Sequence, residues 1–231
     1  GFLIPVSGKY SSLSDLPDRL PLFPLSGALL LPRTQMPLNI FEPRYLQMVD
    51  DALAGHRVIG MVQPEQNLDF DELQDPDAHP ALYRVGCAGR ITSFMETEDN
   101  RYLITLTGIS RFMIEREHDA MTAYRQCKPA WSAYKDDLRA GHGEEDVARE
   151  RLLDVLKTYL KVNGLNADWN AIKSAPNESL VNSLSVISPY GPSEKQALLE
   201  AKTLEDRNQM LIALTEMALA RDSNDGSGTV Q

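Results

Sequence analysis

The hydrophobic pattern of this chain changes its period once, and that change constrains the fold more than any other feature. Up to about residue 131, apolar residues alternate with polar ones in short runs broken by turns, a pattern typical of β-strands. After residue 140 they recur every three to four residues, which predicts helices. The sequence therefore predicts an α+β fold with a β-rich domain at 1–131, a linker at 132–146, an α-helical domain at 147–221 and a flexible tail at 222–231.

The clearest β pattern lies in residues 83–117, which predict two strands joined by a polar turn at 96–100. On the first strand, one face is expected to carry Val85, Cys87, Ile91 and Met95. On the second, one face is expected to carry Tyr102, Ile104 and Leu106, with Phe112 and Ile114 keeping that phase. Glycines inside these strands mark bulges or tight bends, at Gly86, Gly89 and Gly108. Repeated bends favour a small, closed, barrel-like sheet.

One helix is expected to interrupt the β half. Pro43 suits the first helical position, where its missing N–H costs nothing, and Gly55 can end the helix. The apolar face of this helix consists of Tyr45, Met48, Val49 and Ala52. A further strand is predicted at 56–63.

The second half predicts a helical bundle. Apolar stripes run through 143–164 and 177–188, and a long helical segment follows. The sequence "SEKQ" at 193–196 has the form of a capping box in which the Ser193 hydroxyl caps a helix. Thr203 either caps a separate last helix or lies within a continuous one.

The net charge of −10 bears on the class of partner. Residues 1–131 hold 12 basic and 17 acidic groups, and residues 132–231 hold 11 and 16, so each part carries −5. This balance argues against nucleic acid as a partner. No apolar run approaches the roughly 20 residues of a membrane helix, and the N-terminus lacks the pattern of a secretory signal. Two cysteines, Cys87 and Cys127, predict free thiols in a reducing cytoplasm.

Motifs for nucleotide or metal chemistry are missing. The sequence contains no G-x-x-x-x-G-K-[ST] loop and no G-x-G-x-x-G after a strand. The histidines are far apart, with no ligand spacing around His56, His79, His118 or His142. Six carboxylates fall within 64–80 without the glycine and acid spacing of an EF-hand, which predicts a solvated loop, with weak divalent binding as the alternative. We expect no cofactor, no metal site and no catalytic residue.

Two pairs of polar residues could in principle take part in a reaction. Glu42 and Arg44 lie in the apolar run "LNIFEPRYLQMV" and are either a reactive pair or the polar corner of a fold. Because side chains two residues apart do not face each other on a helix, each is expected to find its partner elsewhere, which favours the scaffold role. Ser193 and Lys195 could form a Ser–Lys dyad. The capping role of Ser193 argues against it.

Several of these residues resemble a known family, the N-terminal (substrate-binding) domain of ATP-dependent Lon protease. The first block, residues 20–49, matches a Pro-Leu-Phe-Pro start and a Pro-Leu strand that runs into Phe-Glu-Pro-Arg-Tyr, through Pro21, Leu22, Phe23, Pro24, Pro37, Leu38, Phe41, Glu42, Pro43, Arg44 and Tyr45. Two later strands are similar through Gly86, Ile91, Gly108, Arg111 and Phe112. The helical half is similar with looser motifs. The resemblance implies a PUA-like barrel in the first half.

The resemblance also implies a function. No ATPase module and no protease domain follow before Gln231, so we expect a stand-alone, non-enzymatic module that binds other proteins or unfolded polypeptide segments, in the manner of a quality-control adaptor. The positions implied to matter for structure or binding are Phe23, Pro24, Phe41, Glu42, Pro43, Arg44, Tyr45, Gly108, Arg111 and Phe112. An apolar groove between the two domains is the expected location. The alternatives are an enzyme or a small-molecule sensor that uses the same cleft. A monomer and a homodimer both stay open.

Overall fold

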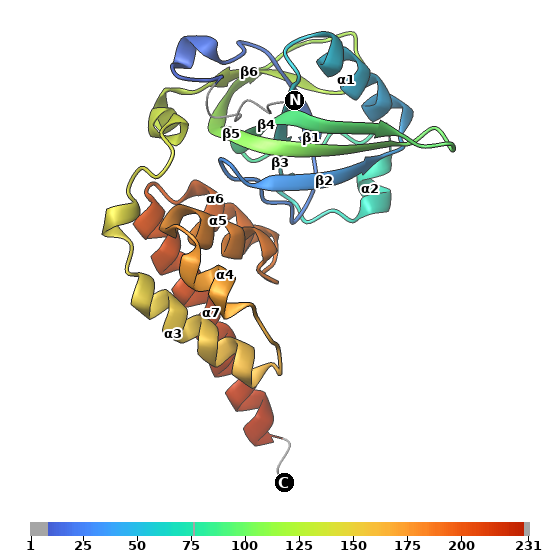
Figure 1. Ribbon diagram of the computed structural model, residues 1–231. Coiled ribbons are helices and arrows are strands. Elements are labelled where there is room, and N and C mark those ends of the chain that lie inside the picture. Colours follow the sequence, from blue (N-terminus) through green and yellow to red (C-terminus); the bar gives the residue numbers. More distant parts are fainter. Residues whose placement is uncertain (1–8, 76, 229–231) are drawn as a thin grey trace. The chain divides into compact units, whose positions relative to one another are not determined.

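The computed structural model describes residues 9–75 and 77–228 (Figure 1). The chain divides into two compact units, Gly1–Ala140 and Gly141–Gln231. Residues Ser132–Leu138, which the sequence predicts to be linker, form the 3-10 helix η3 and pack against strand β5 in the first unit. We call the first the β unit and the second the helical unit.

The β unit contains six strands. They are β1 Leu20–Pro24, β2 Gln35–Ile40, β3 Val58–Val62, β4 Val85–Glu96, β5 Tyr102–Glu117 and β6 Gln126–Ala130. They form one sheet in the order β2-β5-β4-β3-β1-β6, and β5 pairs with β6 as well, so the pairings run in a closed circuit from β5 back to β5. β1 and β3 are parallel, and the other pairs are antiparallel. Large buried side chains fill the core, including Leu20, Leu22, Leu106 and Phe112.

The strands of the long hairpin depart from regular alternation at two bulges. Register shifts lie between Ala88 and Gly89 and between Ile91 and Ser93. At the first, Ala88 faces Ser110 and Gly89 faces Gly108, so the extra residue is Ile109 on β5. The prediction that Phe112 and Ile114 keep the phase of Leu106 was therefore wrong. The second shift moves Met95 to the opposite phase, and Met95 is 56% exposed, so the prediction that it shares a face with Ile91 was wrong too.

Gly108 lies beside the first register shift and Gly86 lies at none, but both glycines also allow a close backbone contact. A Cβ atom at Gly108 would overlap the carbonyl oxygen of Leu31, and one at Gly86 would overlap that of Met61. Neither carbonyl can move aside as a flexible side chain could. Both positions therefore need glycine because another backbone segment passes close to them.

The first helix begins and ends as predicted. α1 spans Pro43–Ala54 with Pro43 in its first turn and Gly55 at its C-terminal cap, and it buries Met48, Val49 and Ala52. A second helix, α2 Phe70–Gln74, occupies the stretch predicted to be a loop. Its cap is Asp69, whose side chain accepts a hydrogen bond from the Glu72 N–H at 2.8 Å. That prediction of a helix-free loop was wrong because a five-residue helix leaves almost no periodic signal.

The helical unit contains the short 3-10 helix η4 Glu144–Asp146 and five α-helices. These are α3 Arg149–Val162, α4 Trp169–Ser174, α5 Asn177–Ile187, α6 Pro192–Glu200 and α7 Leu204–Gly228. The segment predicted to be a flexible tail is helical as far as residue 228, and residues 229–231 lie outside the described part of the chain. Among the described residues, no helix combines the length and the apolar character that a membrane crossing requires.

Two caps in this unit decide questions that the sequence left open. The Thr203 hydroxyl accepts a hydrogen bond from the Asp206 N–H at 3.0 Å, so α7 is a separate helix. The expected Ser193 cap was wrong: α6 begins at Pro192 after Gly191, and the Ser193 hydroxyl donates to Glu194 at 3.0 Å. Pro192 already suits the first helical position, which shifts the helix start two residues toward the N-terminus.

Three cations of the helical unit bind the C-terminal carbonyl groups of short helices. Arg149 donates to the Ile172 and Lys173 carbonyls at the end of α4 and to Ala175 just beyond it. Lys195 donates from its buried ammonium group to the Ser185 and Val186 carbonyls of α5. Arg207 donates to the Leu198 carbonyl of α6 and to Asn182. Each cation thereby satisfies acceptors that a helix end leaves without intrahelical donors.

Candidate functional site

The candidate site lies where β2 turns into α1. Ile40 ends the strand, Phe41 follows with 41% of its surface exposed, and Glu42 is the N-terminal cap residue of α1. Pro43 fixes the backbone in the first turn, which aims Tyr45 back toward β1. The rings of Tyr45 and Phe23 lie 4.5 Å apart between centroids, and the Arg44 guanidinium lies 4.7 Å from the Tyr45 ring centroid. The corner thus brings the Phe23 part of the first sequence motif into contact with its Tyr45 part.

These residues surround a shallow apolar depression, which we call the corner hollow. Its volume is about 40 Å³ and its wall consists of Phe23, Pro24, Leu25, Asn39, Ile40, Phe41, Glu42, Tyr45 and Leu73. Leu73 comes from α2, so a helix that the sequence did not predict closes one side. Five of the ten motif positions implied to matter for structure or binding meet here: Phe23, Pro24, Phe41, Glu42 and Tyr45.

Glu42 and Arg44 pair with each other, which corrects the expectation that each finds its partner elsewhere. Arg44 Nε donates to Glu42 Oε2 at 2.9 Å, and both side chains are largely buried. Arg44 also donates to the carbonyl oxygen of Leu73. The rule for helical spacing fails because Glu42 has φ −72° and ψ 135°, an extended conformation that turns its side chain toward Arg44. The pair therefore ties the start of α1 to α2.

A second small depression adjoins the corner hollow, and we call it the arginine hollow. It has a volume of about 60 Å³, shares Pro24, Tyr45 and Leu73 with the corner hollow, and also includes Arg44, His79, Tyr124 and Arg125. Arg125 is already paired with both carboxylate oxygens of Glu117 at 2.7 Å. Tyr124 donates to Asp51 at 2.5 Å, and burial followed by that hydrogen bond raises the pKa of Tyr124. Arg44, Tyr124 and Arg125 of this hollow thus have partners within the protein.

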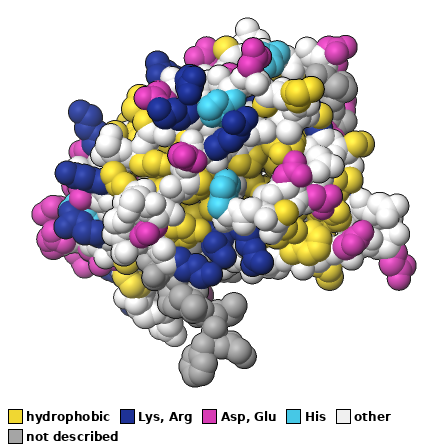
Figure 2. All heavy atoms as spheres, turned by 90° about the horizontal axis from the view of Figure 1, so that it is seen from above, with side chains coloured by type: hydrophobic (Ala, Val, Ile, Leu, Met, Phe, Trp, Pro, Cys, Tyr) yellow, Lys and Arg dark blue, Asp and Glu magenta, His cyan; other side chains and the backbone are white. Residues whose placement is uncertain are grey.

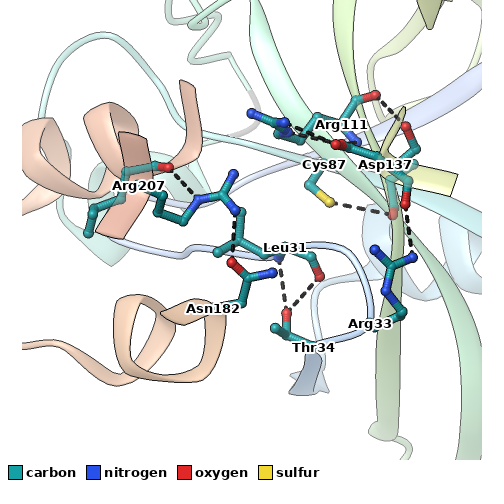
Figure 3. A network of polar contacts seen from close by, with 11 residues as sticks. Leu31, Arg33, Thr34, Cys87, Arg111, Asp137, Asn182 and Arg207 are labelled. Atoms are coloured by element: carbon teal, nitrogen blue, oxygen red, sulfur yellow. Dashed lines mark hydrogen bonds and ion pairs between the residues drawn. The ribbon is translucent and has the colours of Figure 1, made fainter. Parts of the chain in front are cut away.

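Three further motif positions, Gly108, Arg111 and Phe112, lie in β5 and do not line the corner hollow. Phe112 is fully buried, and its ring lies 5.9 Å from that of Trp131. Gly108 allows Leu31 to pass, as described above. Arg111 donates from Nε and Nη2 to both Asp137 oxygens at 2.9 Å, and the Asp137 carbonyl accepts from Arg33 at 2.8 Å (Figure 3). Burial lowers the pKa of Arg111, but the hydrogen bonds and charge of Asp137 outweigh it, so the net shift is upward. These residues hold η3 and the sheet together.

The corner hollow has the chemistry of a binding site for apolar groups. Glu42 is its single carboxylate among the described wall residues and is occupied by Arg44. Burial raises the pKa of Tyr45, with Arg44 opposing that rise, so the phenol stays neutral near pH 7. None of the described residues in the wall is a cysteine, serine or histidine that could act as a nucleophile or base. Figure 2 shows hydrophobic side chains gathered in patches between Lys, Arg and His side chains on the face it displays.

The other candidate groups have structural explanations. Lys195 donates to two helix carbonyls and Ser193 to Glu194, so the two do not form a dyad. Cys87 and Cys127 are buried and free of a disulfide, as predicted. Burial raises the pKa of the Cys127 thiol to about 12, so it is not an activated nucleophile. Among residues 9–75 and 77–228, no three His, Cys, Asp or Glu side chains cluster in a way that could hold a metal ion.

Sequence reasoning missed four residues that complete the corner hollow: Leu25, Asn39, Ile40 and Leu73. Leu73 carried one signal, since it is an apolar residue inside an acidic stretch that needs somewhere to pack. The other three lie beside motif residues, Leu25 directly after β1 and Asn39 and Ile40 at the end of β2.

Comparison with known proteins places this geometry in a family. The family model of the ATP-dependent protease La (LON) substrate-binding domain matches residues 19–216. The Lon protease of Flavobacterium johnsoniae is 25% identical over 236 residues, which cover 95% of this chain and 27% of that protein. The Lon protease of Dictyoglomus thermophilum is 24% identical over 214 residues, which cover 87% and 24%. The chain thus spans about a quarter of the length of these curated relatives.

Solved structures show the same fold. The Lon N-terminal domain protein from Xanthomonas campestris superposes with a TM-score of 0.56 at 23% identity and covers 84% of this chain and 97% of that one. The N-terminal domain of the Mycobacterium avium complex Lon protease has a TM-score of 0.55 at 16% identity and covers 86% and 98%. Because the family model spans most of the sequence, the chain belongs to the LON substrate-binding domain family.

Proposed function

We propose that this protein binds apolar segments of polypeptide substrates at the corner hollow and does not itself cleave them. The observation that carries the proposal is the convergence of five motif positions on one exposed apolar surface. The other motif residues are needed for the scaffold, whereas Phe41 is a large apolar side chain left 41% exposed. A concave apolar surface with an exposed aromatic rim is a surface on which an apolar side chain of a partner can pack.

The chemistry of the hollow favours a side chain from an unfolded segment. Its volume of about 40 Å³ accepts part of one apolar side chain, not a folded surface or a drug-sized ligand. Full burial of one large apolar side chain contributes about 1.5–3 kcal/mol, which gives weak affinity per segment. Weak, sequence-tolerant contacts suit a module that meets many different substrates.

The test compares two phenylalanines of equal exposure. Phe41 is 41% exposed in the corner hollow, and Phe94 is 42% exposed on β4, where it packs edge-on against Tyr102 outside the hollow. Phe41→Ala should weaken binding of a fluorescently labelled, permanently unfolded polypeptide by roughly tenfold, equivalent to about 1.4 kcal/mol. Phe94→Ala should leave it unchanged. Equal losses in both variants, or none in either, would refute the proposal.

We further propose an architecture for each unit, a class of partner and a cellular setting. The closed circuit of strand pairings supports a barrel-like β unit, and the five α-helices of the second unit support a bundle. The partners we propose are other proteins rather than nucleic acid, because the net charge is −10. Cytoplasmic quality control is the setting that we propose. An enzymatic role for Glu42 is not favoured, because its carboxylate is engaged by Arg44.

A further inference from the structure

The helical unit contains a pocket more than ten times the volume of the corner hollow, and we call it the helical pocket. Its volume is about 460 Å³, against about 40 Å³ for the corner hollow. Its wall is formed by α3, α4, α5, α7 and the connections that follow α3 and α5, and it includes Leu156, Leu160, Ile172, Leu184 and Leu211. Volumes of about 300–1,000 Å³ with mainly apolar walls are typical of small-molecule sites.

The walls carry no charge. Among the sixteen described residues that line the helical pocket, none has a carboxylate, an amine, a guanidinium or an imidazole. A charged group that entered would lose its hydration without gaining a partner, which costs several kcal/mol. The pocket therefore selects for neutral molecules.

The wall of the helical pocket also contains the Tyr190 hydroxyl, which is held by a contact with Thr215. The Thr215 hydroxyl donates its single hydrogen to the Leu211 carbonyl at 2.8 Å. Thr215 Oγ1 also lies 2.7 Å from the Tyr190 hydroxyl, and the arrangement that satisfies both contacts of Thr215 has Tyr190 as the donor. The Tyr190 oxygen keeps acceptor capacity for a further donor. Burial raises the pKa of Tyr190, so the phenol stays neutral.

We propose that the helical pocket binds a neutral, largely apolar small molecule that carries one hydroxyl or N–H donor. The volume corresponds to about fifteen groups the size of a water molecule, at about 30 Å³ each. A medium-length aliphatic alcohol or a compact aromatic amide has this size and polarity. The donor is placed to meet the Tyr190 oxygen, and the apolar body lies against the leucines of α3, α5 and α7.

A peptide backbone fits this pocket less well. Each residue of an extended segment brings one N–H and one C=O, and every such group buried without a partner costs about 1–3 kcal/mol. The wall offers few polar side chains, mainly Asn166, Ser188 and the two tyrosines Tyr159 and Tyr190. The site is thus distinct in chemistry from the corner hollow.

The experiment uses the full chain and the neutral dye Nile red as the reporter ligand. Two isomeric competitors, 1-decanol and 1-methoxynonane, differ in that only the alcohol can donate a hydrogen bond. Decanoate and decylammonium supply matched charged competitors, and a Leu- and Phe-rich peptide supplies the polypeptide alternative. The filling variant is Val155→Phe on the pocket wall of α3, and its control is Val162→Phe, on the same helix but outside the pocket and 57% exposed.

The expected results are specific. Val155→Phe should weaken dye binding by roughly tenfold or more while Val162→Phe leaves it unchanged, and the charged competitors should displace the dye roughly tenfold less well than 1-decanol. Tyr190→Phe should make 1-decanol and its isomeric ether displace the dye equally well. If Val155→Phe does not fold, this comparison tests the proposal instead. Equal binding in Val155→Phe and Val162→Phe, equal competition by decanoate, or displacement by the peptide alone would overturn the proposal.

Discussion

The β unit and the helical unit bury positive charge in different ways. In the β unit, largely buried arginines pair with carboxylates: Arg44 with Glu42, Arg111 with Asp137 and Arg125 with Glu117. In the helical unit, Arg149, Lys195 and Arg207 donate mainly to the carbonyl groups that end α4, α5 and α6. In the β unit, carboxylates neutralise the buried positive charge. In the helical unit, backbone carbonyl groups and helix dipoles stabilise it.

This difference has a consequence for stability. Removal of a carboxylate leaves a full, uncompensated charge in the β unit. Removal of a cation from the helical unit leaves neutral carbonyl groups short of a donor, which costs less. The β unit should therefore be more sensitive to loss of a single charged partner.

The largest expected effect is the loss of Asp137. Its side chain is 11% exposed and that of Arg111 is 6% exposed, so Asp137→Ala should lower the free energy of unfolding of the β unit by about 3–5 kcal/mol. Urea unfolding followed by Trp131 fluorescence in a Trp169→Phe background reports on this unit, because the chain has two tryptophans and Trp131 lies in the β core. Glu115→Ala is the control: it breaks an ion pair about half exposed on both sides and should cost less than about 1 kcal/mol.

A smaller effect is expected for Arg207. Arg207→Met keeps most of the apolar volume but removes the donors to the Leu198 carbonyl and to Asn182, which should cost about 1–3 kcal/mol. Unfolding followed by helical circular dichroism measures it. A loss greater than that of Asp137→Ala would show that helix-end acceptors bind the cation as strongly as a carboxylate does, and the comparison between the units would fail.

The pH dependence of the two units should have opposite signs. Burial raises the pKa of Cys127 from 9.0 to about 12, so above pH 9 the unfolded chain loses a proton that the folded β unit retains, and stability falls. Burial lowers the pKa of Lys195 from 10.5 to about 8, so between these values the folded helical unit loses its proton first, and stability rises. Each slope is at most about 1.4 kcal/mol per pH unit.

Two variants isolate these slopes. Cys127→Ala should flatten the fall measured by Trp131 fluorescence between pH 9.0 and about pH 12, and Lys195→Met should remove the rise measured by circular dichroism between about pH 8 and pH 10.5. Wild-type and variant curves that stay parallel across these ranges would mean that neither group changes its protonation on unfolding in the stated direction.

The smallest effects concern helix N-termini in the helical unit. Thr203→Ala should cost about 1 kcal/mol because the hydroxyl caps α7. Ser193→Ala should change stability by less than about 0.5 kcal/mol, since that hydroxyl contacts only the Glu194 side chain. The reverse order in thermal unfolding would restore the capping box that the sequence suggested.

The sequence predicted the elements whose signals are local. The change of period separated β from helical structure, and the Pro43 and Gly55 signals placed α1 correctly. The motif comparison also named five of the nine residues that line the corner hollow. It did not distinguish them from Arg111 and Phe112, because that distinction depends on which residues pack together in space.

The errors arose where conformation or distance in sequence mattered. The pairing of Glu42 with Arg44 depends on an extended residue beside a helical one, and a helical spacing rule does not describe that junction. The partners of Lys195 and Arg207 are backbone carbonyls about ten residues earlier in the chain, which no side-chain pattern reveals. The helical pocket is lined by residues from several helices, so its volume follows only from their packing.

Site-specific photo-crosslinking tests directly whether unfolded polypeptide binds at the corner hollow. A benzophenone side chain introduced at Phe41, and in a separate variant at Phe94, would be irradiated with an unfolded polypeptide. We expect efficient crosslinking from position 41 and little from position 94, although Phe41 and Phe94 are equally exposed. Equal crosslinking from both positions, or none from position 41, would contradict the assignment of the corner hollow as the substrate-binding surface.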